Sequence, residues 1–151
     1  MLIKEKKFKK DAILLAKIIK DMWVKYDWIL CVTWWWLHLT YYLSKLLGIK
    51  QIININVSSY QWKKSKRMKD YSPPTYLNRY MNYLIVDDLV DSWRTVKFIR
   101  SKYWLGMDLD TAVLYHKNKC RKPTYYVSEK SADERIDFYY EQSIDEWKDT
   151  C

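Results

Sequence analysis

The sequence predicts a single α/β domain in which a parallel β-sheet lies between helices. Short apolar segments typical of buried strands alternate with amphipathic segments typical of helices, and this alternation implies right-handed crossovers between parallel strands. The hydrophobic fraction of 49% and the charged fraction of 30% are ordinary for a soluble globular protein. A length of 151 residues suits one folding unit better than two.

The first half of the chain supplies two predicted helices around one strand. From Phe8 to Tyr26, apolar side chains recur at three- and four-residue steps, as on one face of a long amphipathic helix. Residues 28–32 are apolar and rich in branched and aromatic side chains, which indicates a buried strand, and a loop over 33–38 follows. The helical period returns over 39–47, and Gly48 stands where a helix commonly ends.

The second half continues the alternation. Isoleucine and valine alternate with asparagine over 51–57, which predicts a strand, whereas 58–80 is polar and has no core-facing pattern. The remaining elements are predicted in this order: a strand over 83–86, a polar loop over 87–94, a helix over 95–103 and a strand over 111–115. Because parallel sheets bind ligands at the carboxyl ends of their strands, we expect the site at the loops over 33–38 and 87–94.

Composition and charge narrow the class of protein. The longest apolar stretch, residues 28–37, is too short to span a bilayer, and residues 1–10 lack the apolar core of a secretory signal. Three cysteines without CxxC spacing indicate neither a disulfide framework nor a zinc site, so we expect a reducing, cytoplasmic environment. The formal charge of +9 favours an anionic partner, which includes nucleic acid, an acidic membrane surface and a polyphosphate substrate.

The segment from Tyr83 to Thr95 is the most informative. Its hydrophobic start ends in Asp87 and Asp88, a third carboxylate follows at Asp91, and hydroxyl side chains flank the start of the next helix. Adjacent acids at a strand end can accept hydrogen bonds from vicinal hydroxyls or hold hydrated magnesium, and a helix start suits a phosphate. A sugar phosphate satisfies both requirements. The alternative is that the acids merely end a strand and that Asp91 or Ser92 caps a helix.

The same segment resembles the signature with which type I phosphoribosyltransferases bind phosphoribosyl pyrophosphate (PRPP). The signature consists of hydrophobic residues, two acids, two hydrophobic residues, Asp, Thr or Ser, Gly, any residue and Thr, and only Trp93 departs from it. The resemblance implies that Asp87 and Asp88 bind the ribose hydroxyls and hold Mg²⁺, directly or through water. It implies that Asp91 is the catalytic proton acceptor. The 5′-phosphate would be wrapped by Ser92, Trp93, Arg94 and Thr95.

Further segments are similar to the xanthine-guanine and hypoxanthine branch of that family. Residues 29–33, followed by Leu37, resemble its first strand and pyrophosphate loop, which implies that PRPP also contacts Thr33, Trp34, Trp35 and Trp36. Residues 57–60 resemble the start of a flexible loop that closes over PRPP. Residues 112–117 resemble the strand that delivers a base-contacting lysine, here Lys117, for which the alternative is an ordinary surface lysine.

A pattern over 133–141 resembles the base-covering hood of the branch, for which we expect approximate bounds of 117–145. The resemblance implies that Arg135 and Ile136 contact the base. Arg135 stands where an aromatic side chain normally stacks on the base, and a guanidinium can also stack on a ring. Tyr139 and Tyr140 replace proline and tryptophan, which puts the identity of the base in doubt.

The resemblance implies a purine phosphoribosyltransferase with a Rossmann-like parallel sheet, a C-terminal hood and one domain over 1–151. It would transfer 5-phosphoribosyl from PRPP to a 6-oxopurine base and release pyrophosphate, with Mg²⁺ as cofactor. We expect a cytoplasmic homo-oligomer without membrane or nucleic-acid partners. The alternatives are a non-catalytic nucleotide-sensing or RNA-binding relative, a generic basic binding module, or an enzyme for adenine or a pyrimidine.

Tryptophan and glycine occur in unusual numbers. The chain has nine tryptophans and only two glycines, and together they make up roughly 7% of the residues, the ordinary share of glycine alone. Trp35, Trp36 and Trp93 occupy positions at which the family's phosphate loops use glycine. Glycine is used there because the backbone turns with positive φ and approaches an anion closely.

One hypothesis explains both observations. Some bacterial lineages read the codon UGA as glycine, so a gene from such a lineage, translated with UGA as tryptophan, has this composition. Trp28, Trp62 and Trp104 can have the same origin. The alternative is that the tryptophans are genuine and that the chain is a degenerate, non-catalytic relative with obstructed phosphate sites.

Overall fold

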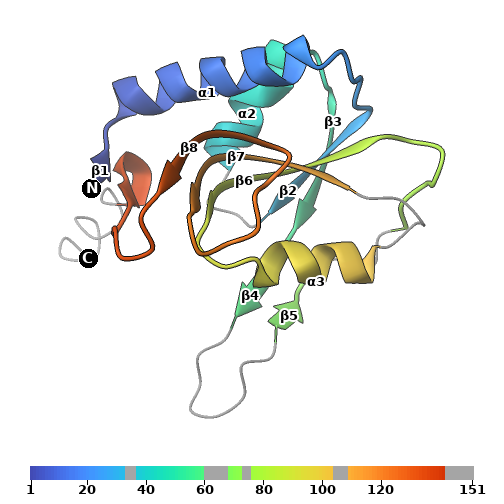
Figure 1. Cartoon of the computed structure of the whole chain (residues 1–151). Helices are drawn as coiled ribbons and strands as arrows, with labels where there is room; N and C mark the ends of the chain where they lie inside the picture. Colours follow the sequence, from blue (N-terminus) through green and yellow to red (C-terminus); the bar gives the residue numbers. More distant parts are fainter. Residues whose placement is uncertain (33–36, 60–67, 73–75, 104–108, 142–151) are drawn as a thin grey trace, which may run out of the picture.

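The computed structural model describes residues 1–32, 37–59, 68–72, 76–103 and 109–141. Their core is a five-stranded parallel sheet in the order β3-β2-β6-β7-β8 (Figure 1). In that order, the strands are Gln51–Ile55, Trp28–Val32, Tyr83–Val90, Asp110–Lys117 and Tyr125–Lys130. The chain runs outward from β2 to β3 and, in the other direction, from β6 to β8. The switch point, where open α/β sheets bind ligands, therefore lies at the carboxyl ends of β2 and β6.

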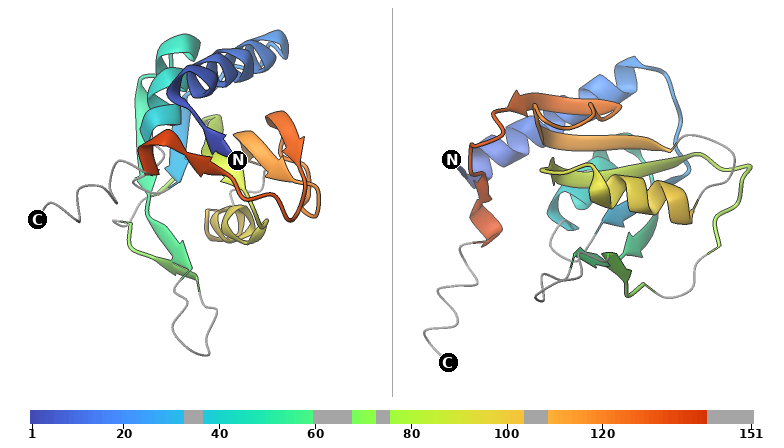
Figure 2. Two further views of the ribbon diagram at one scale, coloured as in Figure 1. Left: turned by 90° about the vertical axis from the view of Figure 1, so that its left-hand side faces the viewer. Right: turned by 60° about the horizontal axis from the view of Figure 1, so that its bottom comes forward.

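Helices cover both faces of the sheet (Figure 2). α1 (Glu5–Asp21) and α2 (Leu37–Leu47) lie on one face, and α3 (Arg94–Lys102) lies on the other. Because successive side chains of a strand point to opposite faces, Val86 of β6 packs with the α1–α2 cluster and Ile85 packs with the α3 cluster. The predicted α/β class with a parallel sheet between helices is confirmed. None of the described helices is long and apolar enough to cross a membrane.

Two small sheets complete the described structure. β1 (Leu2–Ile3) pairs in parallel with β9 (Asp137–Phe138), so the first residues lie beside the C-terminal part of the described chain. β4 (Val57–Ser59) pairs antiparallel with β5 (Met68–Asp70), and this pair lies beyond the main sheet, below α3 in Figure 1.

The structure corrects several predicted boundaries. β6 does not end before the acidic pair but continues to Val90, because its pairing with β7 extends to the Val90–His116 position. The strand expected over 51–57 is divided at Asn56, whose N–H donates to Oγ of Ser72 at 2.7 Å. β8, in the segment expected to form the hood, is the half-exposed edge strand of the main sheet, and its apolar pattern is correspondingly weak.

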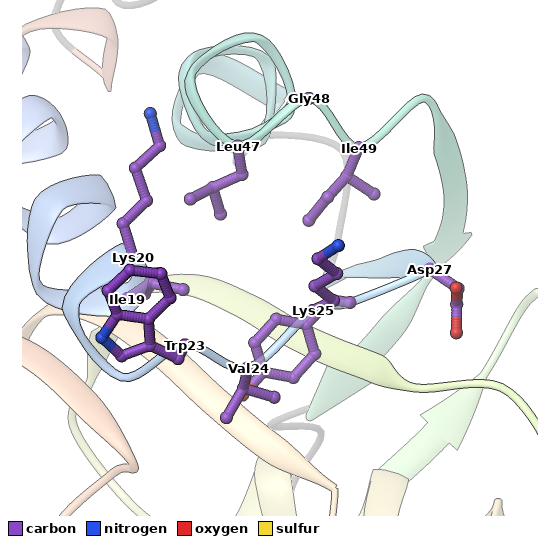
Figure 3. A pocket seen from close by; sticks show the side chains of 10 residues that line it. Ile19, Lys20, Trp23, Val24, Lys25, Asp27, Leu47, Gly48 and Ile49 are labelled. Atoms are coloured by element: carbon purple, nitrogen blue, oxygen red, sulfur yellow. The ribbon is translucent and has the colours of Figure 1, made fainter.

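The helix expected to reach Tyr26 ends at Asp21, and Trp23 follows its last turn. Trp23 is the one described non-glycine residue with a positive φ, 58°, and it is 92% exposed. Gly48 occupies the same place after α2, with a φ of 70°. Both residues line a pocket of about 400 Å³ at the amino ends of the strands, away from the switch point (Figure 3). Trp23 thus has a backbone conformation that favours glycine.

Replacing Trp23 by glycine is expected to raise the free energy of unfolding by about 1 kcal/mol. A left-handed φ costs a residue with a Cβ roughly 1–2 kcal/mol, and the greater entropy of glycine in the unfolded chain offsets part of the gain. Urea unfolding followed by circular dichroism measures the change. Gly48→Ala is the matched control, because an added Cβ meets nothing within 4 Å there. The loss of stability expected in Gly48→Ala therefore reports backbone strain alone. A loss of stability in Trp23→Gly would mean that packing of the indole outweighs the strain.

Candidate functional site

The acidic pair predicted to bind ribose lies near the carboxyl end of β6. Asp88 is completely buried and Asp87 is 7% exposed. The backbone N–H of Asp88 donates to Oδ1 of Asp87 at 3.0 Å. Oδ1 of Asp88 has no hydrogen-bond partner among the described residues. Because strand side chains alternate, Asp88 points to the α1–α2 face and Asp87 to the α3 face.

Burial dominates the electrostatics of this pair. Burial raises the pKa of Asp87 to about 7, although the hydrogen bond from the Asp88 backbone acts to lower it. Burial also raises the pKa of Asp88 well above its usual value, and the negative charge of Asp87 adds to the rise. A ligand that donates hydrogen bonds to these carboxylates, or a cation beside them, favours their ionised forms.

The hydroxyl of Tyr140 donates to Oδ2 of Asp88 at 2.5 Å. The Tyr140 ring is nearly parallel to the ring of Phe138, with centroids 5.4 Å apart, and to the ring of His38, with centroids 4.8 Å apart. His38 lies in the first turn of α2, directly after the loop that follows β2. The C-terminal segment and the start of α2 therefore meet at the acidic pair.

The turn between β6 and α3 carries the predicted phosphate-binding residues. α3 begins at Arg94 with Trp93 as its N-cap, and no side chain of this cap bonds to the helix. The N-cap is thus Trp93 and not Asp91 or Ser92 of the alternative interpretation, and N–H groups at the start of a helix suit an anion. The side chain of Asp91 is 64% exposed, and its Oδ1 lies 3.8 Å from Nζ of Lys119. Thr95 lies in the first turn of α3.

Trp93 does not have the positive φ expected from the glycine pattern. Its φ of −68° and ψ of 0° are right-handed and open to any residue. Its half-buried ring lies 5.3 Å from the guanidinium of Arg100 and 5.9 Å from that of Arg121. An obstruction of the phosphate site by Trp93 is therefore a matter of side-chain volume and not of backbone strain.

The predicted base-binding residues differ in their surroundings. Lys117 ends β7, is 3% exposed and donates from Nζ to the carbonyl of Glu134, so it is not the surface lysine of the alternative interpretation. Arg135 is largely exposed, and its Nε lies 2.8 Å from Oδ1 of Asp137. Ile136 is buried in the α1–α2 cluster. Lys117 is thus hydrogen-bonded to the segment that carries Arg135. Ile136 packs in the core and has a structural role.

The predicted pyrophosphate-binding residues Thr33, Trp34, Trp35 and Trp36 lie outside the described residues, as does most of the predicted flexible loop. The residues on either side are described. Val32 ends β2, which pairs with β6, and Leu37 begins α2. The strand that precedes the predicted pyrophosphate loop therefore adjoins the strand of the acidic pair.

The acidic pair fits a magnesium ion in one respect, since carboxylate oxygens are preferred ligands of Mg²⁺ and one oxygen of Asp88 is unpartnered within the described residues. In the described part of the chain, no group of three or more His, Cys, Asp and Glu side chains could hold an ion. Asp87 and Asp88 therefore supply too few ligands for Mg²⁺ by themselves, and water or substrate oxygens would add to them.

No family model matches the chain, and no curated protein matches it by sequence. Solved structures match it over almost its whole length. The Helicobacter pylori xanthine-guanine-hypoxanthine phosphoribosyltransferase superposes with a TM-score of 0.74 at 22% identity, over 98% of this chain and 96% of the other. A purine phosphoribosyltransferase from Pyrococcus horikoshii gives a TM-score of 0.75 at 21% identity, over 91% and 92% of the two chains.

The chain has the type I phosphoribosyltransferase fold. A third structure with this similarity is a hypothetical protein from Neisseria gonorrhoeae with bound ppGpp, at a TM-score of 0.76 and 22% identity, over 97% of this chain and 92% of that one. The likeness confirms the fold that the resemblance over 83–95 implied. At sequence identities of 21–22%, the structural similarity is evidence for the fold alone.

Two residues of the candidate site were not predicted from the sequence. Tyr140 was noted as a departure from the hood pattern, and His38 was placed in a loop, with no role assigned to either. Tyr140 is brought to Asp88, and His38 to Tyr140, by contacts between segments distant in the sequence, which periodicity does not reveal. A tyrosine in place of tryptophan was the available signal, because a hydroxyl buried beside a carboxylate commonly donates to it.

Proposed function

We propose that this protein is a purine phosphoribosyltransferase that transfers the 5-phosphoribosyl group of PRPP to a 6-oxopurine base and releases pyrophosphate. One observation carries the proposal: at the switch point of this fold, a buried acidic pair lies in the strand that leads through a short turn to the start of α3, where the N-cap residue makes no side-chain hydrogen bond. Such an arrangement offers acceptors for ribose hydroxyls and N–H donors for a phosphate. The proposal covers 1–151 as one domain, acting in the cytoplasm as a homo-oligomer.

In the proposed reaction, the ribose hydroxyls donate to Asp87 and to the unpartnered oxygen of Asp88, and the first N–H groups of α3 bind the 5′-phosphate. Asp91 takes or relays the proton of the base, a role that its exposure supports. Asp87 and Asp88, together with substrate oxygens, would hold Mg²⁺, which would supply positive charge to offset that of the pyrophosphate leaving group.

The purine is proposed to bind between Lys117 and the C-terminal segment. Lys117 donates to the exocyclic 6-oxygen, because an ammonium has three donors and the carbonyl of Glu134 occupies one. The exposed guanidinium of Arg135 stacks on the ring. Buried Ile136 holds this segment in place.

We also propose that Trp35, Trp36 and Trp93 are UGA-encoded glycines in the cell. The composition supports this, since tryptophan and glycine together have the ordinary share of glycine. The left-handed φ of Trp23 adds support that does not depend on composition or on family resemblance. Sequencing the gene for UGA at these codons, and peptide mass spectrometry of the protein from its own cells, test the coding proposal directly.

The enzymatic proposal is tested with two proteins, the chain as given and a triple-glycine variant that carries Trp35→Gly, Trp36→Gly and Trp93→Gly. Magnesium-dependent PRPP consumption is measured with guanine, hypoxanthine and xanthine. We expect turnover in the triple-glycine variant and little or none in the tryptophan-containing chain, because an indole at a glycine position of a phosphate loop would take the space that the anion needs. Inactivity of both proteins, with both folded, would reject the catalytic proposal.

A second candidate function is nucleotide sensing without catalysis. The observation that favours it is the bound ppGpp in the structurally similar Neisseria gonorrhoeae protein, together with the charge of +9 on this chain. Calorimetric titration of both proteins with ppGpp tests it, with a short RNA titrated at several salt concentrations as the control for general anion binding. Tight ppGpp binding without PRPP turnover would favour this candidate.

A further inference from the structure

The ring of Tyr140 is held firmly at the edge of the candidate site. Tyr140 is 7% exposed, and its ring lies parallel to those of Phe138 and His38. Phe8 of α1 meets it edge-on, with centroids 5.7 Å apart. A tyrosine ring packed by three aromatic neighbours from separate segments has little freedom, so its hydroxyl has a defined position.

That hydroxyl donates a hydrogen bond to Oδ2 of the Asp88 carboxylate. The other oxygen, Oδ1, has no partner among the described residues, although it is buried. A carboxylate held through one oxygen cannot rotate freely about its last bond. The contact with Tyr140 therefore determines which oxygen of Asp88 is left for a ligand.

We propose that Tyr140 is a positioning residue, whose hydroxyl holds Oδ2 of Asp88 so that Oδ1 accepts a ribose hydroxyl of PRPP. This inference rests on the proposed function. It makes binding of the sugar depend on the C-terminal segment, because Tyr140 belongs to the segment that follows β9 and not to the strand that carries the acids.

The test compares Tyr140→Phe with Tyr139→Phe, both in the triple-glycine variant. Each change removes one hydroxyl and keeps the ring. The hydroxyl of Tyr139 lies 3.1 Å from Nδ1 of His38, whereas the hydroxyl of Tyr140 bonds to Asp88. We expect Tyr140→Phe to raise the Kd and the KM for PRPP about 10-fold or more, since a hydrogen bond to a charged group is lost. We expect Tyr139→Phe to leave the Kd and the KM for PRPP nearly unchanged. The KM for the base is expected to change little in either variant.

A double-mutant cycle separates positioning from general support of the fold. If Tyr140 acts through Asp88, Tyr140→Phe has little further effect on PRPP affinity once Asp88→Asn is present, whereas independent roles give additive losses. Thermal unfolding of each variant confirms that the proteins compared are folded. Equal PRPP affinities for the parent and Tyr140→Phe, or full additivity in the cycle, would overturn the inference.

A substrate-free measurement keeps this inference distinguishable from the proposed function. The ¹³C chemical shift of the Asp88 carboxyl carbon is expected to change in Tyr140→Phe and to stay the same in Tyr139→Phe. If no protein binds PRPP, the proposed function fails and the ribose-positioning role fails with it, while the carboxyl shift still reports the hydrogen bond. An unchanged shift in Tyr140→Phe would refute the hydrogen bond itself, whatever the activity.

Discussion

Replacing Asp91 by asparagine in the triple-glycine variant is expected to lower kcat by about 10²- to 10⁴-fold, the usual contribution of a general base. Asp91 is the carboxylate of the motif whose side chain is largely exposed, at 64%, and it lies at the start of the turn into α3. It can therefore reach a substrate, and an amide of the same shape cannot accept a proton. Because the ribose contacts are assigned to Asp87 and Asp88, the KM for PRPP is expected to change little.

Steady-state kinetics over a range of PRPP and guanine concentrations measures the effect. Asp21→Asn is the matched control, because Asp21 is also exposed but ends α1 near the amino ends of the strands. A kcat within a few-fold of the parent in Asp91→Asn would remove Asp91 from the catalytic role. A parallel rise in KM would instead assign Asp91 to binding.

The acidic pair is expected to make the ligand-free protein less stable as the pH rises from about 4 to about 7. Asp87 has a pKa of about 7 in the folded protein against an ordinary value of 3.8, so the folded state retains a proton that the unfolded chain has lost. The stability linked to this proton is complete below pH 4 and is lost as the pH rises through 7. The corresponding free energy is on the order of a few kcal/mol.

Urea unfolding of the parent and of Asp87→Asn at several pH values, in metal-free buffer, measures this linkage. The stability of the parent relative to the variant is expected to fall as the pH rises. Asp70→Asn is the control of opposite sign. Burial acts to raise the pKa of Asp70, but hydrogen bonds from Lys102 and Ser72 lower it overall, so its contribution is lost as the pH falls. A difference between parent and Asp87→Asn that does not depend on pH would contradict the raised pKa.

The strands and the helix beginnings were largely predictable, whereas the strand ends were not. Residues 28–32 form the predicted strand because all five side chains are apolar, so the signal for a buried strand lies within the segment itself. The extension of β6 to Val90 was missed, since two aspartates are poor strand signals and pairing with β7 outweighs that local preference. β1 and β9 were missed because each has two residues and finds its partner across nearly the whole chain.

The parallel α/β class and the position of the acidic motif follow from the amino-acid sequence, because strand and helix periods and a thirteen-residue pattern are local properties. Only the folded chain shows that Asp88 is buried against Tyr140, that Lys117 bonds to Glu134 and that the backbone of Trp23 has a left-handed φ. These features depend on which distant segments pack together and on where a helix stops. Packing determines burial, and burial in turn determines the pKa of Asp87, so the electrostatics of the site emerge only when the chain has folded.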